Sequence, residues 1–168
     1  VPMPSKLHSL HMPSNKHETY DMPEMITSMS VRPTGDLLVA SHHGINNFSF
    51  EEKKLTKILD LEPQLPNNRC NDGASDAKGR FWVGTMQNNI SPEATDIELK
   101  ESSGNLYCIN HDLTFNKFES GIAVSNTIVW SPDNTKFYFT DTLSQTIFSY
   151  DFDLEKGQIS NKKEFVKY

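Results

Sequence analysis

The sequence lacks the features that mark several protein classes. It has two cysteines, Cys70 and Cys108, which is too few for a disulfide framework. No hydrophobic run reaches the length of a membrane span, and a net charge of -6 leaves no basic face for nucleic acid. Residues 1–5 show neither the basic segment nor the apolar core of a signal peptide. We therefore expect a cytoplasmic protein with no membrane or nucleic-acid partner.

Two kinds of catalytic motif are also missing. The sequence contains no Gly-x-Ser-x-Gly elbow and no glycine-rich phosphate loop, which argues against a serine hydrolase and against nucleotide chemistry. Long helical periodicity is absent as well. What remains is ordinary globular composition, with 36% hydrophobic residues and eight glycines in 168 residues. That length is enough for one domain with a real core.

A polar turn followed by an apolar strand occurs three times along the chain. The three copies lie at residues 33–40, 77–84 and 132–140. A unit of about 40–50 residues with four short strands is the period of a β-propeller blade. The sequence therefore predicts an all-β fold of four-stranded antiparallel blades, with blade boundaries near 25, 66 and 122 and with residues 1–168 inside one propeller domain. Residues 87–103 lengthen the second repeat and form a candidate binding loop.

The most informative stretch runs from Arg69 to Met86 and begins with a polar cluster. Asn71-Asp72-Gly73 is typical of a tight turn that fixes the direction of polar side chains. Arg69 lies two residues before Asn71, so both side chains share one face of an extended segment. A forked donor beside an amide suits an oxygen-rich ligand. The alternative is an arginine that pairs with a nearby carboxylate next to an ordinary turn.

The whole stretch resembles the signature of the SMP-30/regucalcin/gluconolactonase family, which includes luciferin-regenerating enzymes. The shared pattern is Asn-Asp-Gly, Asp-x-x-Gly-Arg, an aromatic strand and Gly-Thr-Met. A second block, Ser125-Asn126 followed by Trp-Ser-Pro-Asp at 130–133, is similar to another family motif. Thr127 departs from it, because the family has glycine after the asparagine. The resemblance covers the chain from about residue 6 to the end.

The resemblance implies a closed ring of six blades, of which this chain would supply about three to four. The remaining blades would then come from a longer protein. A ring cut by proteolysis and a chain whose remainder is disordered are the alternatives. Because a propeller site is assembled from several blades, we expect this chain alone to be inactive.

The resemblance also implies one divalent ion, Ca²⁺ or Zn²⁺, held by an early Glu, by Asn126 and by a late Asp. Both acids would lie outside this chain, and the late Asp would also accept the proton. Amide and carboxylate oxygens are hard ligands that suit Ca²⁺. Without the resemblance, Asn126 would be interpreted as a turn residue before a strand.

The substrate positions implied by the resemblance are Arg69, Asn71, Met86 and Asn89. Arg69 and Asn71 would contact the substrate's hydroxyl and carbonyl oxygens, and Met86 would line the pocket floor. Animal members carry an acid near the position of Asn89, so its amide puts sugar-lactone specificity in doubt. Asp72 is a candidate orienting residue behind the site, or equally an Asx-turn acceptor. We expect Asp141 and Thr142 to bond backbone at a strand end.

Two functions follow from these implications. The first is a gluconolactonase-like, metal-dependent hydrolase that opens a small lactone. The second is a regucalcin-like propeller that binds calcium or serves as an interaction scaffold without catalysis. The co-occurrence of Arg69, Asn71 and Asn126 favours the first, whereas the uncharged Asn88 and Asn89, together with Thr127, favour the second.

Overall fold

The computed structural model describes residues 5–168, which form fourteen β-strands and one short 3₁₀ turn. This confirms the predicted all-β class. The strands are β1 (Ser5–His11), β2 (Lys16–Met22), β3 (Ile26–Val31), β4 (Leu37–Ser41), β5 (Gly44–Ser49), β6 (Lys54–Leu59), β7 (Asn68–Ser75), β8 (Phe81–Gln87), β9 (Gly104–Ile109), β10 (Phe115–Ile122), β11 (Ser125–Trp130), β12 (Lys136–Asp141), β13 (Thr146–Asp153) and β14 (Gln158–Lys167), with the 3₁₀ turn at Thr142–Ser144. Residues 1–4 of the predicted domain lie outside the described residues.

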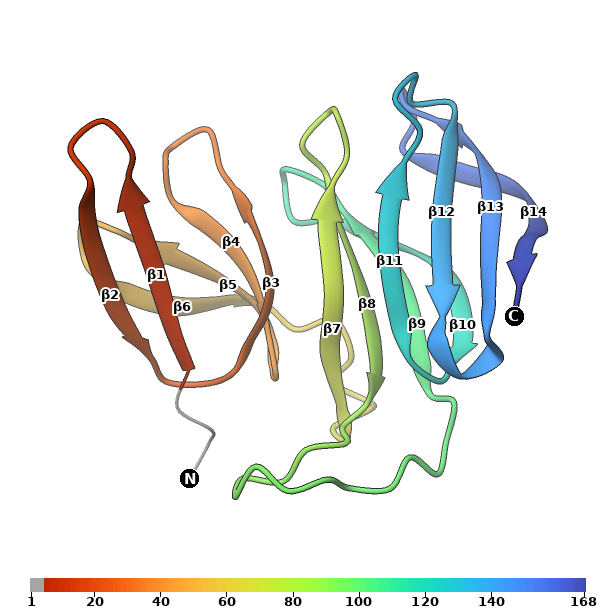
Figure 1. Cartoon of the computed structure of the whole chain (residues 1–168), viewed down its shortest axis with the longest axis horizontal. Coiled ribbons are helices and arrows are strands. Elements are labelled where there is room, and N and C mark those ends of the chain that lie inside the picture. Colours follow the sequence, from red (N-terminus) through yellow and green to blue (C-terminus); the bar gives the residue numbers. More distant parts are fainter. Residues whose placement is uncertain (1–4) are drawn as a thin grey trace.

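The strands form one two-stranded and three four-stranded antiparallel sheets. The hairpin β1–β2 stands alone, and β3–β6, β7–β10 and β11–β14 are each a meander in chain order. Figure 1 shows the first strands, β3, β7 and β11, side by side, and the contacts between them agree. Consecutive four-stranded sheets with their first strands adjacent have the arrangement of neighbouring propeller blades.

The turns between the first two strands of each sheet are the predicted repeats. Gly35, Gly79 and Asn134 occupy the same place in the three turns, with φ angles of 89°, 78° and 56°. Each donates its N–H to the carbonyl three residues earlier, over 2.9, 2.8 and 2.9 Å. A positive φ favours glycine or asparagine. The turn chemistry noticed in the sequence therefore marks equivalent hairpins.

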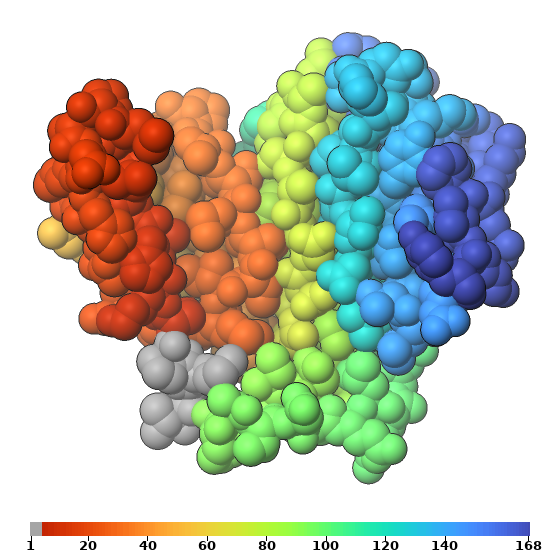
Figure 2. All heavy atoms as spheres, in the orientation of Figure 1, coloured from red at the N-terminus to blue at the C-terminus, as the bar shows by residue number. Residues whose placement is uncertain are grey.

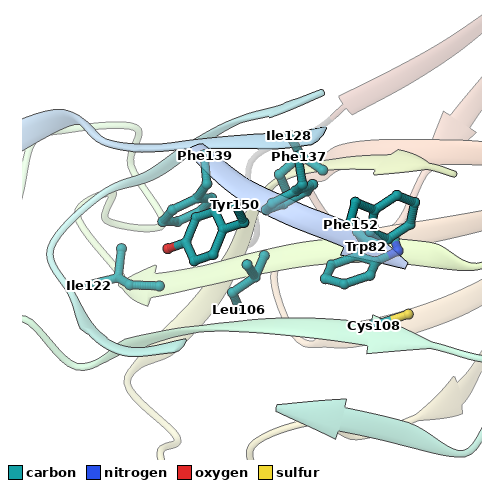
Figure 3. Close-up of a cluster of buried hydrophobic side chains, with 9 residues drawn as sticks. All are labelled: Trp82, Leu106, Cys108, Ile122, Ile128, Phe137, Phe139, Tyr150 and Phe152. Carbon is teal, nitrogen blue, oxygen red and sulfur yellow. The ribbon is translucent and has the colours of Figure 1, made fainter. Parts of the chain in front are cut away.

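Hydrophobic clusters fill the space between neighbouring sheets and hold them together. Figure 3 shows the cluster between β7–β10 and β11–β14, which includes the fully buried Trp82. The other members in the figure are Leu106, Cys108, Ile122, Ile128, Phe137, Phe139, Tyr150 and Phe152. Two further clusters join β3–β6 to β7–β10 and the β1–β2 hairpin to β3–β6. Burial of apolar area is the main force that keeps such sheets packed face to face.

One glycine sets how closely two of the sheets approach. A Cβ on Gly84, in β8, would lie 1.4 Å from the Ser125 Oγ and 2.4 Å from the Ser125 Cβ of β11. Only the absence of a side chain allows this approach. It brings the start of β11 against β8 and so positions Asn126.

The long connection between β8 and β9 lies at the end of the sheets where β7 and β11 begin. Figure 1 shows this segment, in green, extending across the lower end of the sheets, and Figure 2 shows its atoms covering that end. The predicted binding loop therefore lies at the end that carries the polar cluster.

Candidate functional site

Irregular pairing at the start of two first strands directs polar side chains out of the sheets. The β7–β8 register shifts between Cys70 and Gly73, and the β11–β12 register shifts between Asn126 and Val129. Such bulges free a residue from the regular alternation and re-aim its side chain, which is why they are common beside functional sites. Asn71 falls within the first bulge, and Asn126 stands at the edge of the second.

Arg69, Asn71 and Asn126 meet in one hydrogen-bond network that joins two sheets. Arg69 Nη1 donates to Asn71 Oδ1 over 2.7 Å, and Asn71 Nδ2 donates to Asn126 Oδ1 over 3.1 Å. Asn71 Nδ2 also donates to the Ser125 carbonyl over 2.8 Å. Asn126 Nδ2 in turn donates to Thr142 Oγ1 over 2.8 Å. The structure therefore brings together three residues that lie up to 57 positions apart in the sequence.

Asn89, from the long connection, completes this network on the other side of Arg69. Its Oδ1 accepts from Arg69 Nη2 over 2.7 Å and from Arg69 Nε over 3.2 Å. The neighbouring Asn88 differs, because its amide bonds the backbone N–H and carbonyl of Ile90 within its own loop. Of these two adjacent asparagines, only Asn89 contacts the site.

Met86 and Asp72 flank the network in different ways. Met86 is 1% exposed and pairs with Arg69 across the β7–β8 ladder. The Asp72 Oδ1 accepts the N–H of Gly73 over 2.9 Å, which is the Asx-turn contact that the sequence suggested as one option. The predicted contributions of Met86 to a pocket floor and of Asp72 to orientation stay predictions.

Burial makes Arg69 electrostatically unusual. Its side chain is 7% exposed, and burial lowers the pKa of the guanidinium, although an arginine remains charged at neutral pH. No ion pair within residues 5–168 involves Arg69. The alternative that Arg69 pairs with a nearby carboxylate is therefore wrong for the described residues. A cavity of about 370 Å³ borders the arginine on the side of the β6–β7 connection.

A buried carboxylate, Glu62, joins several strands beside the cavity, and the sequence did not predict it. Glu62 is 8% exposed, and its two oxygens accept hydrogen bonds from four neutral donors. The donors are Asn68, Thr85, Asn105 and Tyr107. These contacts tie the connection before β7 to β8 and β9. Sequence gave no signal for them, because the partners lie between 6 and 45 positions from Glu62.

Both cysteines are unsuited to nucleophilic chemistry. Cys70 and Cys108 are free and buried. Burial is the main cause that raises the pKa of each thiol to about 12. Because the thiolate is the reactive form, neither residue is a nucleophile at neutral pH.

Residues 5–168 contain no group of three His, Cys, Asp or Glu side chains that could hold a metal ion. Asp141, near the network, accepts the backbone N–H groups of Ala123, Val124 and Leu143 and is thereby occupied, as its position at a strand end predicted. The Asn126 Oδ1 accepts one hydrogen bond and keeps a second lone pair. Asn126 therefore fits one amide-oxygen ligand of a hard cation, and further ligands would have to come from outside these residues.

The expectation that the Thr142 side chain bonds backbone is wrong, because its hydroxyl accepts a hydrogen bond from the Asn126 side chain. The hydroxyl holds the Asn126 amide nitrogen, which leaves the oxygen turned toward Asn71. The signal that was available is the strand register: Asn126 pairs with Thr140, and the 3₁₀ turn that begins at Thr142 brings the chain back beside it.

Successive four-stranded sheets with a polar network at one end of their first strands define a propeller-type protein. The profile of the SMP-30/Gluconolactonase/LRE-like region matches residues 3–168, and the chain belongs to this family. The described residues include no helix of the length and hydrophobicity that a membrane span needs.

Known relatives and solved structures agree with this membership. The chain is 30% identical over 149 residues to regucalcin of Oryctolagus cuniculus, covering 89% of this chain and 48% of the relative. It superposes on regucalcin from Agrobacterium tumefaciens, described as a calcium-binding protein, with a TM-score of 0.81, 27% identity and coverage of 95% and 51%. A luciferin-regenerating enzyme gives a TM-score of 0.79, 25% identity and coverage of 96% and 53%. The chain spans about half the length of these proteins.

Proposed function

We propose that the chain is part of a metal-dependent hydrolase that opens a small lactone. It would act within one six-bladed propeller domain whose other blades come from outside this sequence, with blade boundaries near 25, 66 and 122. The observation that carries the proposal is the single network of Arg69, Asn71 and Asn126 at the start of two first strands, joined by Asn89 from the β8–β9 connection. Family membership supports it.

The proposed cofactor is one divalent ion, Ca²⁺ or Zn²⁺, with Asn126 Oδ1 as its ligand from this chain. When bound, such an ion polarises a carbonyl and lowers the pKa of water. Thr142 fixes the Asn126 amide so that its oxygen is available. Loss of a hydrogen bond that orients a metal-binding side chain typically lowers metal affinity by about 10–100-fold.

The other residues would bind and orient the substrate. Arg69 donates a hydrogen bond to a lactone oxygen, and a donor placed where negative charge develops stabilises an oxyanion. Asn71 Oδ1 accepts a hydrogen bond from a substrate hydroxyl, because both of its N–H groups are bound by Ser125 and Asn126. Asn89 positions the Arg69 guanidinium. Met86 forms the floor of the pocket, and Asp72 orients the bulge behind Asn71. The carboxylate that accepts the proton is proposed to lie in the blades outside this chain.

The intact protein tests this function with gluconolactone in the presence of Ca²⁺, Zn²⁺ or Mn²⁺. We expect metal-dependent turnover that Asn126→Ala abolishes. Thr142→Val should lower the metal affinity about tenfold. Thr142→Ser keeps the hydroxyl and should bind the metal as tightly as the parent protein does. The 168-residue chain alone should be inactive. A turnover rate that is the same with and without metal, and unchanged by Asn126→Ala, would refute the proposal.

The second candidate is a calcium-binding propeller or interaction scaffold without catalysis. The regucalcin relatives and the amide at Asn89 favour it. Calcium binding without turnover on a panel of lactones would support this candidate. The reduced state of both cysteines favours the cytoplasm, which stays a prediction.

A further inference from the structure

The positive charge of Arg69 is buried without a negative partner in the described chain. All of the hydrogen-bond acceptors that Arg69 has among residues 5–168 are neutral oxygens. They are the Cys70 carbonyl at 2.8 Å and the amide oxygens of Asn71 and Asn89. Removing a cation from water costs free energy that neutral dipoles repay only in part. An anion bound beside Arg69 would therefore offset part of this free-energy cost.

The network still has donors to offer such an anion. A guanidinium has five N–H groups, and four of those of Arg69 are used by Cys70, Asn71 and Asn89. One therefore remains. The Asn89 side-chain nitrogen makes no hydrogen bond within residues 5–168, so the amide that holds the arginine adds two more donors.

The cavity beside Arg69 also lacks a free negative charge that could serve instead. Two carboxylates line it, Asp60 and Glu62. Asp60 is bound by Lys57 over 2.8 Å, and Glu62 is bound by its four neutral donors. Arg69 borders this cavity of about 370 Å³, whereas Asn89 is not among the residues that line it.

We propose that the Arg69–Asn89 pair recognises a carboxylate, so that the substrate is a small lactone bearing an acid group rather than a neutral sugar lactone. This rests on the lactonase function proposed above and adds the substrate class. Asn89 determines the preference, because its neutral amide leaves the Arg69 charge uncompensated. An acid at this position would neutralise Arg69 and favour neutral, hydroxyl-rich rings instead.

Kinetics of the intact protein test the substrate class with two rings of equal size. 5-Oxotetrahydrofuran-2-carboxylate carries the acid, and γ-valerolactone carries a methyl group in its place. We expect kcat/KM to be at least about tenfold higher for the acid, since charge-assisted hydrogen bonds are about twice as strong as neutral ones. Asn89→Asp should remove most of this preference. Asn88→Asp adds the same charge one residue away without contacting Arg69 and should leave the preference intact.

A binding measurement separates this inference from the hydrolase function. Cyclopentanecarboxylate and cyclopentanecarboxamide are not hydrolysed, and chelator-treated protein excludes binding through a metal. By calorimetry we expect the carboxylate to bind at least about tenfold more tightly, and Asn89→Asp, but not Asn88→Asp, to abolish the difference. If this holds while no lactone is hydrolysed, the hydrolase proposal fails and the anion site stands. Equal affinity for the two probes in the parent protein would overturn the anion site, as would a carboxylate preference that Asn89→Asp leaves unchanged.

Discussion

Arg69 and Arg80 are buried to nearly the same extent, 7% and 8% exposed, yet their surroundings differ in kind. Arg80 Nε donates to Asp76 Oδ2 over 2.7 Å in an ion pair whose carboxylate is fully buried. Its other nitrogens donate to carbonyls in the turn between β13 and β14. Within residues 5–168, Arg69, at the start of β7, donates only to neutral acceptors. Equally buried arginines therefore differ: the charge of Arg80 is compensated, and that of Arg69 has no carboxylate partner within residues 5–168.

Arg80 joins two neighbouring sheets, β7–β10 and β11–β14, by hydrogen bonds. The turn that contains Asp76 and Arg80 belongs to β7–β8, whereas the carbonyls of Leu154 and Glu155 belong to β13–β14. Gly157 leaves space for this contact, because a Cβ there would lie 2.6 Å from the guanidinium. The Arg80 guanidinium thus stabilises the fold beyond one end of β7, whereas the Arg69 guanidinium, at the other end, has no carboxylate partner within residues 5–168.

The largest expected effect comes from breaking the compensated pair. Arg80→Met leaves Asp76 as an unpaired buried charge and should lower the free energy of unfolding by about 3–5 kcal/mol. Urea denaturation measures this. The double variant Asp76→Asn/Arg80→Met should recover part of the loss, because it removes both charges. A loss below about 1 kcal/mol in the single variant would contradict the role given to the pair.

The matched change at the other arginine should separate stability from function. Arg69→Met removes a buried charge that has no carboxylate partner, so the free energy of unfolding should change by less than about 1 kcal/mol or rise. In the intact protein, kcat/KM on a hydrolysed lactone should fall about 100–1000-fold, the effect of losing one oxyanion donor. Denaturation and steady-state kinetics on the same variant test both halves. A large loss of stability would place Arg69 with Arg80 as a structural residue.

The smallest effect concerns Cys70, which follows Arg69 in β7 and belongs to the hydrophobic cluster between β3–β6 and β7–β10. Its thiol has an unfolded pKa near 9.0 and a folded pKa raised to about 12 by burial. Above pH 9 the unfolded chain loses this proton before the folded protein does, so stability falls as pH rises, by up to about 1.4 kcal/mol per pH unit for each such group. Denaturation at pH 8 and pH 10 in reducing buffer measures the slope. Cys70→Ala should make the slope shallower, and an unchanged slope would contradict the assignment.

Much of the fold was predictable because it depends on local chemistry. The turns at Gly35, Gly79 and Asn134 need a positive φ, and the apolar strands that follow them alternate as sheet residues do. The prediction that Arg69, Asn71 and Asn126 share one site came from the family resemblance. Neither the local sequence patterns nor the family resemblance could have predicted the hydrogen bonds of Glu62, because its partners come from three separate strands.

By itself, the sequence determined the all-β class, the repeating hairpins and which polar residues were candidates for a site, since these depend on turn chemistry, strand periodicity and motif. The tertiary structure alone decided that Arg80 has a carboxylate partner, whereas Arg69 has none in the part of the chain that the structure describes. Charge compensation depends on which oxygens lie within about 3 Å in space, and Asn89, the residue that matters most for Arg69, lies 20 positions away along the chain.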